Sequence, residues 1–482
     1  MELRKGSLPR RVGGVRLTHA VFRRVLIANR GEIAKRIAHA CRALNVRTVG
    51  VFSEADRDAP WLEEMDERVC IGPARAEASY LNARAILQAA EQHECQAIHP
   101  GYGFLAENAV FAARCEQQGI AFIGPGPDAI RRMGNKIEAK RMMAAAGLAT
   151  IPGSDGPVGD AAHAEHEAER IGYPVMLKAA AGGGGRGMRT CGDRAALARA
   201  FDEAAREAEV AFSNPEMYLE KLISGGRHVE VQVLGDAYGD VVHLGDRECS
   251  IQRQHQKLVE ESPAPAVDDR ARAVLGTKVC RAVAALGYRN AGTVEFLLTP
   301  EGEPLFMEMN TRLQVEHPVT ELVTGIDLVV GQLRCAAGER LGFRQADVQA
   351  SGHAIEFRIN AEDPDSDFRP DPGEIVALSL PDPPPGVRVR WDSAARPGYR
   401  VTPHYDSLIG KLIVHAADRP GALEGAREML AGMRIEGVRT TLPLHRRIAS
   451  DPRFVRGAYD VDFLAQGGLA GRRRSSSAAG AS

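Results

Sequence analysis

Acidic, amide and basic side chains gather in the segment PLFMEMNTRLQVEHPVTE. In an extended strand alternate residues face one side, so every second residue of this segment shares one polar face while the other face is mostly apolar. A solvated edge strand would show a similar pattern, and that alternative stays open on this segment alone. The residues on the polar face are Glu308, Asn310, Arg312, Gln314 and Glu316.

A second predicted strand, GTVEFLLT, precedes this segment across the short turn PEGEP. Folding about the turn brings Glu295 roughly opposite Glu308. Two carboxylates that oppose each other across a ladder repel, and a cation that prefers oxygen ligands would reverse the sign. Glu295, Glu308 and Asn310 are hard oxygen ligands of the kind that hold Mg²⁺ together with substrate phosphates. The pattern therefore predicts a metal–nucleotide site.

Four consecutive glycines follow an apolar strand and a lysine in YPVMLKAAAGGGGRGM. Backbone N–H groups of a glycine-rich turn can converge on phosphate oxygens, because no Cβ blocks the approach. The chain has no G-x-x-x-x-G-K-[ST] string, and no G-x-G-x-x-G follows its first predicted strand. A flexible hairpin tip is the plain alternative. A flap that closes over a triphosphate explains the glycines and also Lys178.

Two further segments carry charge near these elements. CSIQRQHQKLVEESP places Gln252, His255 and Lys257 close together, but taken alone it favours a polar surface helix or loop over a site. GHAIEFRINAEDP is typical of a strand with Ile355, Phe357 and Ile359 on one face. Arg358 would then stand on the polar face, where it can stabilise an anion.

The elements that must position these groups begin at VLIANRGEIAKRIAHACRAL, a buried strand followed by a helix with Ile33, Ile37, Cys41 and Leu44 at helical spacing. Strands that alternate with helices predict a parallel α/β first unit, and later segments predict a smaller α+β unit and a larger, more antiparallel region. The expected boundaries are a disordered extension over 1–21, a Rossmann-like unit over 22–130, linker helices over 131–150, a lid over 151–223, a central and C-terminal unit over 224–466, and a disordered tail over 467–482.

Composition excludes several classes of protein. The 482 residues carry a net charge of −2, with no basic stripe through the predicted folded part, which argues against a nucleic-acid binder. No apolar run reaches the ~20 residues of a membrane span. The eight cysteines stand far apart without a C-x-x-C pair, which fits a reducing cytosol, so we expect a cytoplasmic protein.

Seven motifs together closely resemble biotin carboxylase, the ATP-grasp component of biotin-dependent carboxylases. They cover nearly the whole of residues 22–466 in family-like order and spacing: IANRGEIAKRI, AIHPGYGFLAEN, LKAAAGGGGRGM, QRQHQK, EMNTRLQVEHPVTE, RINAEDP and YDSLIGKL. The resemblance implies an ATP-grasp fold of α/β and α+β class, with an N-terminal Rossmann-like domain and a C-terminal biotin carboxylase domain. It also implies carboxylation of biotin by ATP and bicarbonate.

The resemblance assigns roles to residues of this sequence. It implies catalytic roles for Glu316 as the base, Arg312, Arg358 and Lys257, metal ligation of Mg²⁺ or Mn²⁺ by Glu295, Glu308 and Asn310, and contact of Arg358 with biotin. The implied bicarbonate site is Lys257, Arg312, Gln314, Val315 and Glu316. The implied ATP site is Lys136, Lys178, Gly184, Gly185, Met188, Glu220, Lys221, Leu222, Ile223, His228, Gln252, His255, Glu295, Leu297 and Glu308. Within it the resemblance implies that Lys136 and Lys178 contact the phosphates, that residues 220–223 form the adenine-binding stretch, that His228 lies at the ribose and that His255 lies along the phosphate path.

The match has departures that put local packing and partner contacts in question. The family often has arginine where Gln254 stands and cysteine where Phe357 stands, the string DREC replaces the common ERDC, and the loop over 363–375 varies. None of these departures removes a proposed catalytic group. Two rival hypotheses are an ATP-grasp ligase acting on a different carboxylate and a nucleotide-binding paralogue without catalysis, but Lys257, Glu316 and Arg358 are all present.

The resemblance also implies partners. Biotin is normally tethered to a lysine flanked by methionines on a carrier domain, and none of the twelve methionines here is followed by lysine. Residues beyond 466 are too few and too polar for a carrier domain. We therefore expect a stand-alone carboxylase component that forms a homodimer, as is usual in its family. It would receive biotin from a separate biotin carboxyl carrier protein and work with a carboxyltransferase, without nucleic acid or membrane as partner.

Overall fold

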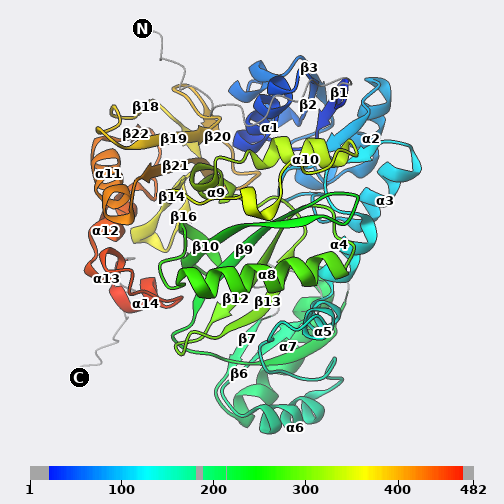
Figure 1. Cartoon of the computed structure of the whole chain (residues 1–482), viewed down its shortest axis with the longest axis vertical. Coiled ribbons are helices and arrows are strands. Elements are labelled where there is room, and N and C mark those ends of the chain that lie inside the picture. The colour runs from blue at the N-terminus through cyan, green and yellow to red at the C-terminus, as the bar shows by residue number, and fades with distance from the viewer. Residues whose placement is uncertain (1–20, 181–187, 213, 470–482) are drawn as a thin grey trace, which may run out of the picture.

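The computed structural model describes residues 21–180, 188–212 and 214–469. Its first unit, blue to cyan in Figure 1, is built on a parallel five-stranded sheet in the order β3-β2-β1-β4-β5. This confirms the α/β prediction, and the helix expected after the first strand forms with Ile33, Ile37 and Cys41 buried. The elements are β1 (Arg24–Ile27), α1 (Gly31–Ala43), β2 (Arg47–Phe52), β3 (Glu67–Cys70), α2 (Ala83–Gln92), β4 (Ala97–His99), α3 (Ala109–Gln117) and β5 (Ala121–Phe122).

Two short helices lead out of the first unit, α4 (Pro127–Gly134) and α5 (Lys136–Ala145). Asn135 between them has an extended backbone, and its side chain accepts hydrogen bonds from the N–H groups of Ile137 and Glu138 at the start of α5. An asparagine at this position satisfies helix donors that have no partner within the helix. Asn135 therefore fixes Lys136 as the first residue of α5.

A small α+β unit follows and lies at the bottom of Figure 1. Its antiparallel sheet has the order β7-β6-β8, and the apolar sides of two helices pack on it. The elements are α6 (Ala161–Ile171), β6 (Val175–Ala179), β7 (Arg189–Cys191), α7 (Arg194–Phe212) and β8 (Met217–Lys221). The predicted glycine flap, with Gly184 and Gly185, falls between β6 and β7 and lies outside the described residues.

An antiparallel eight-stranded sheet joins the middle of the chain to its C-terminal part. The strand order, β13-β12-β9-β10-β11-β14-β21-β19, runs from green to orange across Figure 1, so both parts share one sheet. The strands are β9 (Arg227–Gly235), β10 (Val241–Arg253), β11 (Gln256–Ser262), β12 (Asn290–Leu298), β13 (Pro304–Asn310), β14 (His353–Asn360), β19 (Arg388–Ser393) and β21 (Leu408–Ala416).

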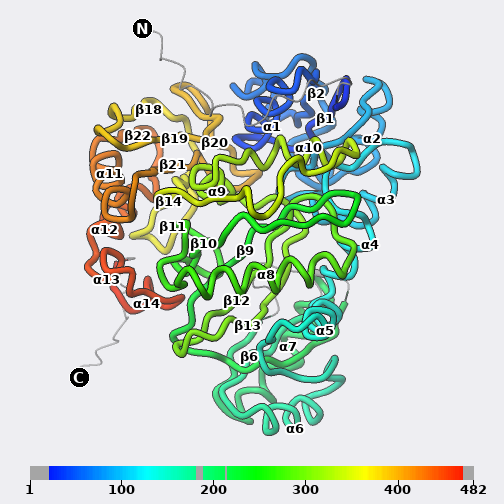
Figure 2. The backbone as a smooth tube through the Cα atoms, viewed as in Figure 1, coloured from blue at the N-terminus to red at the C-terminus, as the bar shows by residue number. Residues whose placement is uncertain are grey.

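Helices cover this sheet and tie it to the first unit. Figure 2 shows α10 beside α1, and Leu328 and Leu333 of α10 share a buried cluster with Ile33 and Ile37 of α1. The helices are α8 (Asp269–Ala285), α9 (His317–Thr324), α10 (Leu328–Ala336), α11 (Arg419–Gly432), α12 (Leu442–Ser450), α13 (Pro452–Val455) and α14 (Phe463–Gly467). Two-stranded ladders complete the C-terminal part: β15 (Glu362–Asp363) with β16 (Arg369–Pro370), β17 (Gly373–Glu374) with β20 (Arg400–Val401), and β18 (Ala377–Ser379) with β22 (Arg434–Glu436).

Within the described ranges, no helix has both the length and the apolar character that crossing a bilayer requires.

Candidate active site

The segment CSIQRQHQKLVEESP forms a strand hairpin, so the surface helix or loop expected for it is wrong. Its turn residues Gln254 and His255 have positive φ angles of 47° and 65°, as in the tight turns that suit two antiparallel strands. The turn places Gln252 opposite Lys257 in the ladder between β10 and β11. The sequence pattern misled because the buried part of this hairpin carries charged side chains, whose partners lie on other strands and helices.

Lys257 is the centre of the candidate site. Its Nζ lies 2.7 Å from Oε1 of Glu316 and 2.9 Å from Oε1 of Glu295. A third acid, Glu230 on β9, places Oε2 at 2.6 Å from the same nitrogen. Burial acts to lower the pKa of Lys257, but the three carboxylates outweigh it and raise the pKa well above its ordinary value. Lys257 is therefore a fixed positive charge that joins three acids.

Glu316 stands directly before α9, and its side chain is 1% exposed. Its second oxygen, Oε2, accepts a hydrogen bond of 2.9 Å from Arg358. Burial acts to raise the pKa of Glu316, but Lys257, Arg358 and Arg247 hold it well below the usual range. The carboxylate is therefore ionised at neutral pH, which is the form that can accept a proton.

Arg358 on β14 is held on two sides. Its Nε donates to Oε1 of Glu260 at 2.5 Å, while NH2 faces Glu316. Glu260 lies opposite Glu356 in the ladder between β11 and β14, and both side chains are buried. Burial raises the pKa of Glu260 to about 7, and it also raises the pKa of Glu356. Glu260 and Glu316 thus hold the guanidinium of Arg358 from two sides.

The face predicted for β14 is confirmed in its apolar half, because Ile355, Phe357 and Ile359 are all buried in the C-terminal core. The polar half is also largely covered. Phe357 stands 5.5 Å from the ring of His445, which contacts the carbonyl oxygen of Arg358. The phenylalanine that departs from the family pattern therefore packs against His445, which in turn contacts the backbone of Arg358.

The single strand expected to carry the polar face through Glu316 ends at Asn310, and the prediction is wrong beyond that residue. The chain must turn there to enter α9, which has proline in its first turn. The side chains still converge. Arg312 donates to Oδ1 of Asn310 at 3.1 Å and to Oε1 of Gln314 at 2.6 Å, and Gln314 donates to Oε1 of Glu295 at 2.9 Å.

Glu107 fixes Arg312 from the first unit of the chain. Its Oε1 accepts the backbone N–H of Thr311 at 2.9 Å, and its Oε2 accepts Nε of Arg312 at 2.8 Å. Arg312 therefore has all three guanidinium nitrogens in hydrogen bonds, with one of them crossing between units. Sequence reasoning missed Glu107 because it lies about two hundred residues away in the chain.

Glu295 and Glu308 are direct cross-strand partners, which confirms the predicted register. Their repulsion is relieved in this structure by separate lysines. Lys257 holds Glu295, and Nζ of Lys136 lies 3.1 Å from Oε2 of Glu308. Asn310, the third predicted metal ligand, donates to Oε1 of Glu295 at 2.8 Å. These three oxygen-bearing side chains thus lie together on one edge of the sheet.

His228 lies beside the same group of acidic side chains. Nε2 of His228 lies 3.2 Å from Oε2 of Glu295, and the pair is buried. In the described part of the chain, two triads of His, Cys, Asp or Glu have ligand atoms within 4.8 Å of one another, and Glu308 belongs to neither. The triads are His228, Glu230 and Glu295, and Glu230, Cys249 and Glu316. The ribose contact predicted for His228 remains a prediction.

A cluster of cations stands on the side of the lid. Nζ of Lys178 lies 2.5 Å from Oε2 of Glu220. The pKa of His255 is lowered by burial and by the nearby charges of Lys178 and Lys136. His255 is therefore mostly uncharged at neutral pH in this structure, and the two lysines predicted to contact phosphates supply the positive charge that favours an anion.

The predicted adenine stretch lies at the end of β8. Nζ of Lys221 donates to the carbonyl oxygens of Gly172 and Tyr173 at 2.8 and 2.9 Å, and the N–H of Leu222 donates to Pro174 at 3.1 Å. These bonds hold β8 at the edge of the lid sheet, and Ile223 is the residue directly after Leu222. The lysine side chain therefore has a local structural role in this structure.

The remaining predicted residues are spread around these groups. Leu297 pairs with His228 in the ladder between β12 and β9. The carbonyl oxygen of Val315 accepts a 2.7 Å hydrogen bond from Lys411, which holds the backbone beside Glu316. Met188 is half-buried directly before β7.

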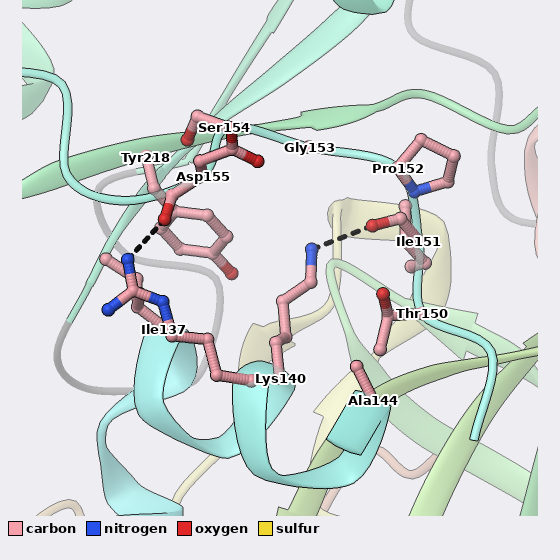
Figure 3. A pocket seen from close by; sticks show the side chains of 11 residues that line it. Ile137, Lys140, Ala144, Thr150, Ile151, Pro152, Gly153, Ser154, Asp155 and Tyr218 are labelled. Atoms are coloured by element: carbon pink, nitrogen blue, oxygen red, sulfur yellow. Dashed lines mark hydrogen bonds between the residues drawn. The ribbon is translucent and has the colours of Figure 1, made fainter. Parts of the chain in front are cut away.

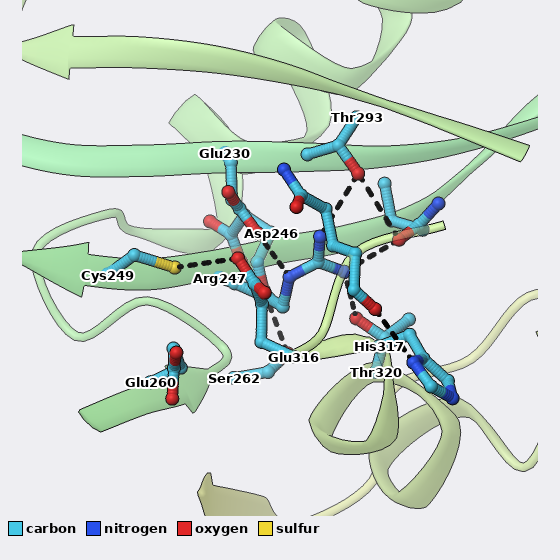
Figure 4. A network of polar contacts seen from close by, with 12 residues as sticks. Glu230, Asp246, Arg247, Cys249, Glu260, Ser262, Thr293, Glu316, His317 and Thr320 are labelled. Carbon is cyan, nitrogen blue, oxygen red and sulfur yellow. Dashed lines mark hydrogen bonds and ion pairs between the residues drawn. The ribbon is translucent and has the colours of Figure 1, made fainter. Parts of the chain in front are cut away.

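Arg247 is a fully buried arginine that the sequence analysis did not place in the site. Figure 4 shows it among Glu230, Thr293 and Thr320. Its Nε lies 2.5 Å from Oε1 of Glu230, and it donates to the two threonine hydroxyls at 3.2 and 3.0 Å. The sequence did contain a sign of this buried polar group. His228, Glu230 and Gln232 alternate along one strand, which places polar side chains at every second position.

The exchanged acids on either side of Arg247 have separate partners. Asp246 accepts a hydrogen bond of 2.8 Å from Nε of Arg272, and Glu248 pairs with Arg227 at 2.9 Å. Both acids are buried. The two acids of the DREC string therefore pair with arginines outside the centre of the site.

Family comparison agrees with this geometry. The N-terminal domain of biotin carboxylase matches residues 21–130, the ATP-binding domain of the carbamoyl-phosphate synthase L chain matches 135–344, and the C-terminal domain of biotin carboxylase matches 356–466. The chain is 50% identical to the biotin carboxylase of Pseudomonas aeruginosa, covering 92% of this chain and 98% of the relative. It is 49% identical to the biotin carboxylase of Haemophilus influenzae, again covering 92% and 98%.

Solved structures agree as well. The biotin carboxylase domain dimer of Hydrogenobacter thermophilus 2-oxoglutarate carboxylase, in complex with MgADP, ADP and bicarbonate, aligns with a TM-score of 0.91 at 46% identity, covering 94% of this chain and all of that one. The Campylobacter jejuni biotin carboxylase aligns with a TM-score of 0.89 at 45% identity, covering 92% and 99%. On the matching domains, the similarity over nearly the whole length and the shared fold, the chain belongs to the biotin carboxylase family.

Proposed function

We propose that this site carboxylates biotin with ATP and bicarbonate, giving N-carboxybiotin, ADP and phosphate, the first half-reaction of a biotin-dependent carboxylase. One observation carries the proposal: a buried, ionised Glu316 lies between Lys257, which leads to the metal-type acids, and Arg358, which faces the other way. The same carboxylate therefore touches both halves of the chemistry.

In the first step an oxygen of bicarbonate attacks the γ-phosphorus of ATP, and the bond to the ADP oxygen breaks. Glu316 takes the bicarbonate proton, and Lys257, Arg312 and Gln314 hold the anion together with the backbone N–H of Val315. The present hydrogen bonds to Glu316 depress its basicity. As Lys257 and Arg358 turn toward substrate oxygens, that effect weakens and the pKa of Glu316 rises toward the working pH.

In the second step carboxyphosphate breaks at its C–O bond into CO₂ and phosphate. The released phosphate takes the proton from N1′ of biotin, and Arg358 stabilises the negative charge that develops on the ureido oxygen. The nitrogen then attacks CO₂ and forms the N–C bond. Preorganised positive groups matter because charge moves in every step, and closure of the lid would keep water from the reactive intermediate.

A divalent cation fits the carboxylates of the site. Glu295 and Glu308 oppose each other across a ladder and supply hard oxygen ligands, and Asn310 adds an amide oxygen. The Hydrogenobacter structure contains MgADP, which supports Mg²⁺ here. When bound, the cation would neutralise phosphate charge, while Lys136 and Lys178 would release their glutamates and turn to phosphate oxygens. Mn²⁺ is proposed as a substitute.

The family resemblance also suggests how the other site residues would contact the nucleotide. The adenine would be enclosed by Glu220, Lys221, Leu222, Ile223, Met188 and Leu297. His228 would lie at the ribose, and Gln252 and His255 would lie along the phosphates.

We infer units over 22–130, 151–223 and 224–466, with the middle one acting as the lid. The proposed partners are a biotin carboxyl carrier protein, a carboxyltransferase and a second copy of the chain, in the cytoplasm.

The test is the choice of acid that triggers ADP release. The purified protein should release ADP from MgATP with bicarbonate, and free biotin should increase the rate. Acetate, formate and carbamate at the same concentration serve as matched acids. If one of these replaces bicarbonate at equal rate, the site belongs to a ligase for another carboxylate. If none, bicarbonate included, promotes ADP release, the chain only binds nucleotide.

A further inference from the structure

We infer that Lys140 is a positioning residue for nucleotide binding: it keeps Glu220 neutralised when Lys178 leaves that carboxylate to reach the phosphates. The inference rests on the proposed function, because it takes Lys178 as a phosphate contact. Lys140 itself is assigned no role by the motifs or by the chemistry above.

Glu220 is held by two lysines from opposite elements. Its Oε1 lies 2.8 Å from Nζ of Lys140 on α5, and its Oε2 lies 2.5 Å from Nζ of Lys178 on β6. The glutamate side chain is 2% exposed, so water cannot replace either lysine easily. Burial acts to raise the pKa of Glu220, but Lys178 and Lys140 outweigh it and lower the pKa. The carboxylate is thus a buried anion that depends on cations.

Lys140 lines a cavity of about 410 Å³ that lies between α5, the segment 150–155 and Tyr218 (Figure 3). Its ammonium also donates to the carbonyl oxygen of Ile151 at 2.8 Å. This second bond anchors Lys140 without help from Glu220. Lys178 has no such second bond among those seen in the described residues, so it is the lysine that can leave.

Lys140 also lies one helical turn after Lys136 on α5, and residues four apart share a helix face. Lys136 pairs with Glu308 and Lys140 pairs with Glu220. One helix face therefore supplies a cation to each of two acids near the proposed phosphate path. Of the two, only Lys136 is expected to move onto the nucleotide.

Removing one partner of a buried ion pair is costly because the other charge stays buried and uncompensated. With Lys140 present, Glu220 keeps one full ion pair after Lys178 departs. Without Lys140, departure of Lys178 would leave Glu220 with no cation. Nucleotide binding would then have to overcome that cost, and Lys178 would stay on Glu220.

The test is the dissociation constant of MgATP in four proteins: the wild type, Lys140→Met, Glu220→Gln and the double variant. Lys140→Met should weaken binding about tenfold in the wild-type background. In the Glu220→Gln background it should change binding less than about twofold, because no buried anion needs a second cation. An equal loss in both backgrounds would mean that Lys140 only supports the fold of the hinge, and no loss in either would also overturn the inference.

Matched controls separate this result from other causes. Arg141→Met alters the next residue of α5, which lines the same cavity but bonds the carbonyl oxygen of Asp155, and it should leave binding unchanged. Lys140→Arg should keep most of the affinity. Lys178→Met should lose ATP affinity by itself, and if it does not, the assigned role of Lys178 fails rather than that of Lys140 alone. Should Lys140→Met not fold, Lys140→Gln, which can still donate a hydrogen bond toward Ile151 but carries no charge, takes its place in the same four-protein comparison.

Discussion

Nζ of Lys257 lies 2.7 Å from Oε1 of Glu316, and the two residues come from two different sequence motifs, QRQHQK and EMNTRLQVEHPVTE. The lysine reaches there from a hairpin turn, and the glutamate stands at the start of a helix. Because Lys257 also binds Glu230 and Glu295, the base is joined to the predicted metal acids through a single ammonium. A change at the metal edge can therefore alter the proton affinity of Glu316.

Replacing Glu316 with glutamine should remove the proton acceptor and keep the shape of the side chain. We expect bicarbonate-dependent ADP release to fall about 10²–10⁴-fold, since a general base contributes in that range. ATP affinity should stay close to wild type, because Glu316 does not lie among the lysines of the phosphate side. Steady-state kinetics and a nucleotide titration check this, and full activity in the variant would remove Glu316 from the role of base.

Replacing Glu308 with glutamine should weaken the dependence of ATP binding on Mg²⁺. Glu308 is about one-third exposed and pairs only with Lys136 in the described part of the chain, so the unfolding free energy without metal should change by less than about 1 kcal/mol. Metal titrations of ATP affinity and a denaturant melt measure the two effects. Unchanged metal dependence would count against Glu308 as a ligand.

Replacing Glu107 with glutamine should raise the KM for bicarbonate roughly tenfold, because Arg312 loses a charged hydrogen-bond partner. The matched control is Glu116→Gln. Glu116 also crosses from the first unit to the central one, where it pairs with Arg289 at 2.6 Å, and no hydrogen bond or ion pair among the described residues joins it to a predicted site residue. Equal effects of the two variants on the KM would show that Glu107 acts only by holding the units together.

Stability should fall as pH rises from about 5 to 7, partly through Glu248. Burial raises the pKa of Glu248 to about 7, above its ordinary value near 4.5. In that interval the folded state binds a proton that the unfolded state has lost, so raising the pH favours unfolding, by on the order of 3 kcal/mol across the window. Denaturant unfolding from pH 5 to 8 measures the slope, and Glu248→Gln should flatten it. An unchanged slope in the variant would assign the effect to other acids such as Glu260.

The parts of this structure that follow local pattern could be predicted from the sequence. Ile33 and Ile37 at helical spacing predicted α1, and the turn PEGEP predicted the pairing of Glu295 with Glu308, because both depend on residues near in sequence. The positive φ angles at Gln254 and His255 could not be predicted, since nothing in their residue types requires them. The hairpin they form is what brings Lys257 into the site.

Buried charged residues were the second feature that could not be predicted from the sequence. Glu230 and Arg247 are both fully buried, and their burial is compensated by their ion pair with each other and by the second ion pair of Glu230 with Lys257. Glu107 contributes from a distant unit, and its contact with Arg312 depends on how the two units meet. Such residues were missed because their partners are close in space and far apart in the chain.

The most direct test of the proposed chemistry follows the oxygen atoms of bicarbonate. If bicarbonate attacks ATP, one of its oxygens must remain on the phosphate when carboxyphosphate breaks at the C–O bond. The protein should be given MgATP, biotin and ¹⁸O-labelled bicarbonate, the reaction stopped before the bicarbonate exchanges its label with water, and the released phosphate analysed by mass spectrometry. We predict one ¹⁸O atom per phosphate. Phosphate that carries no label would show that water attacks ATP, and it would contradict the central claim.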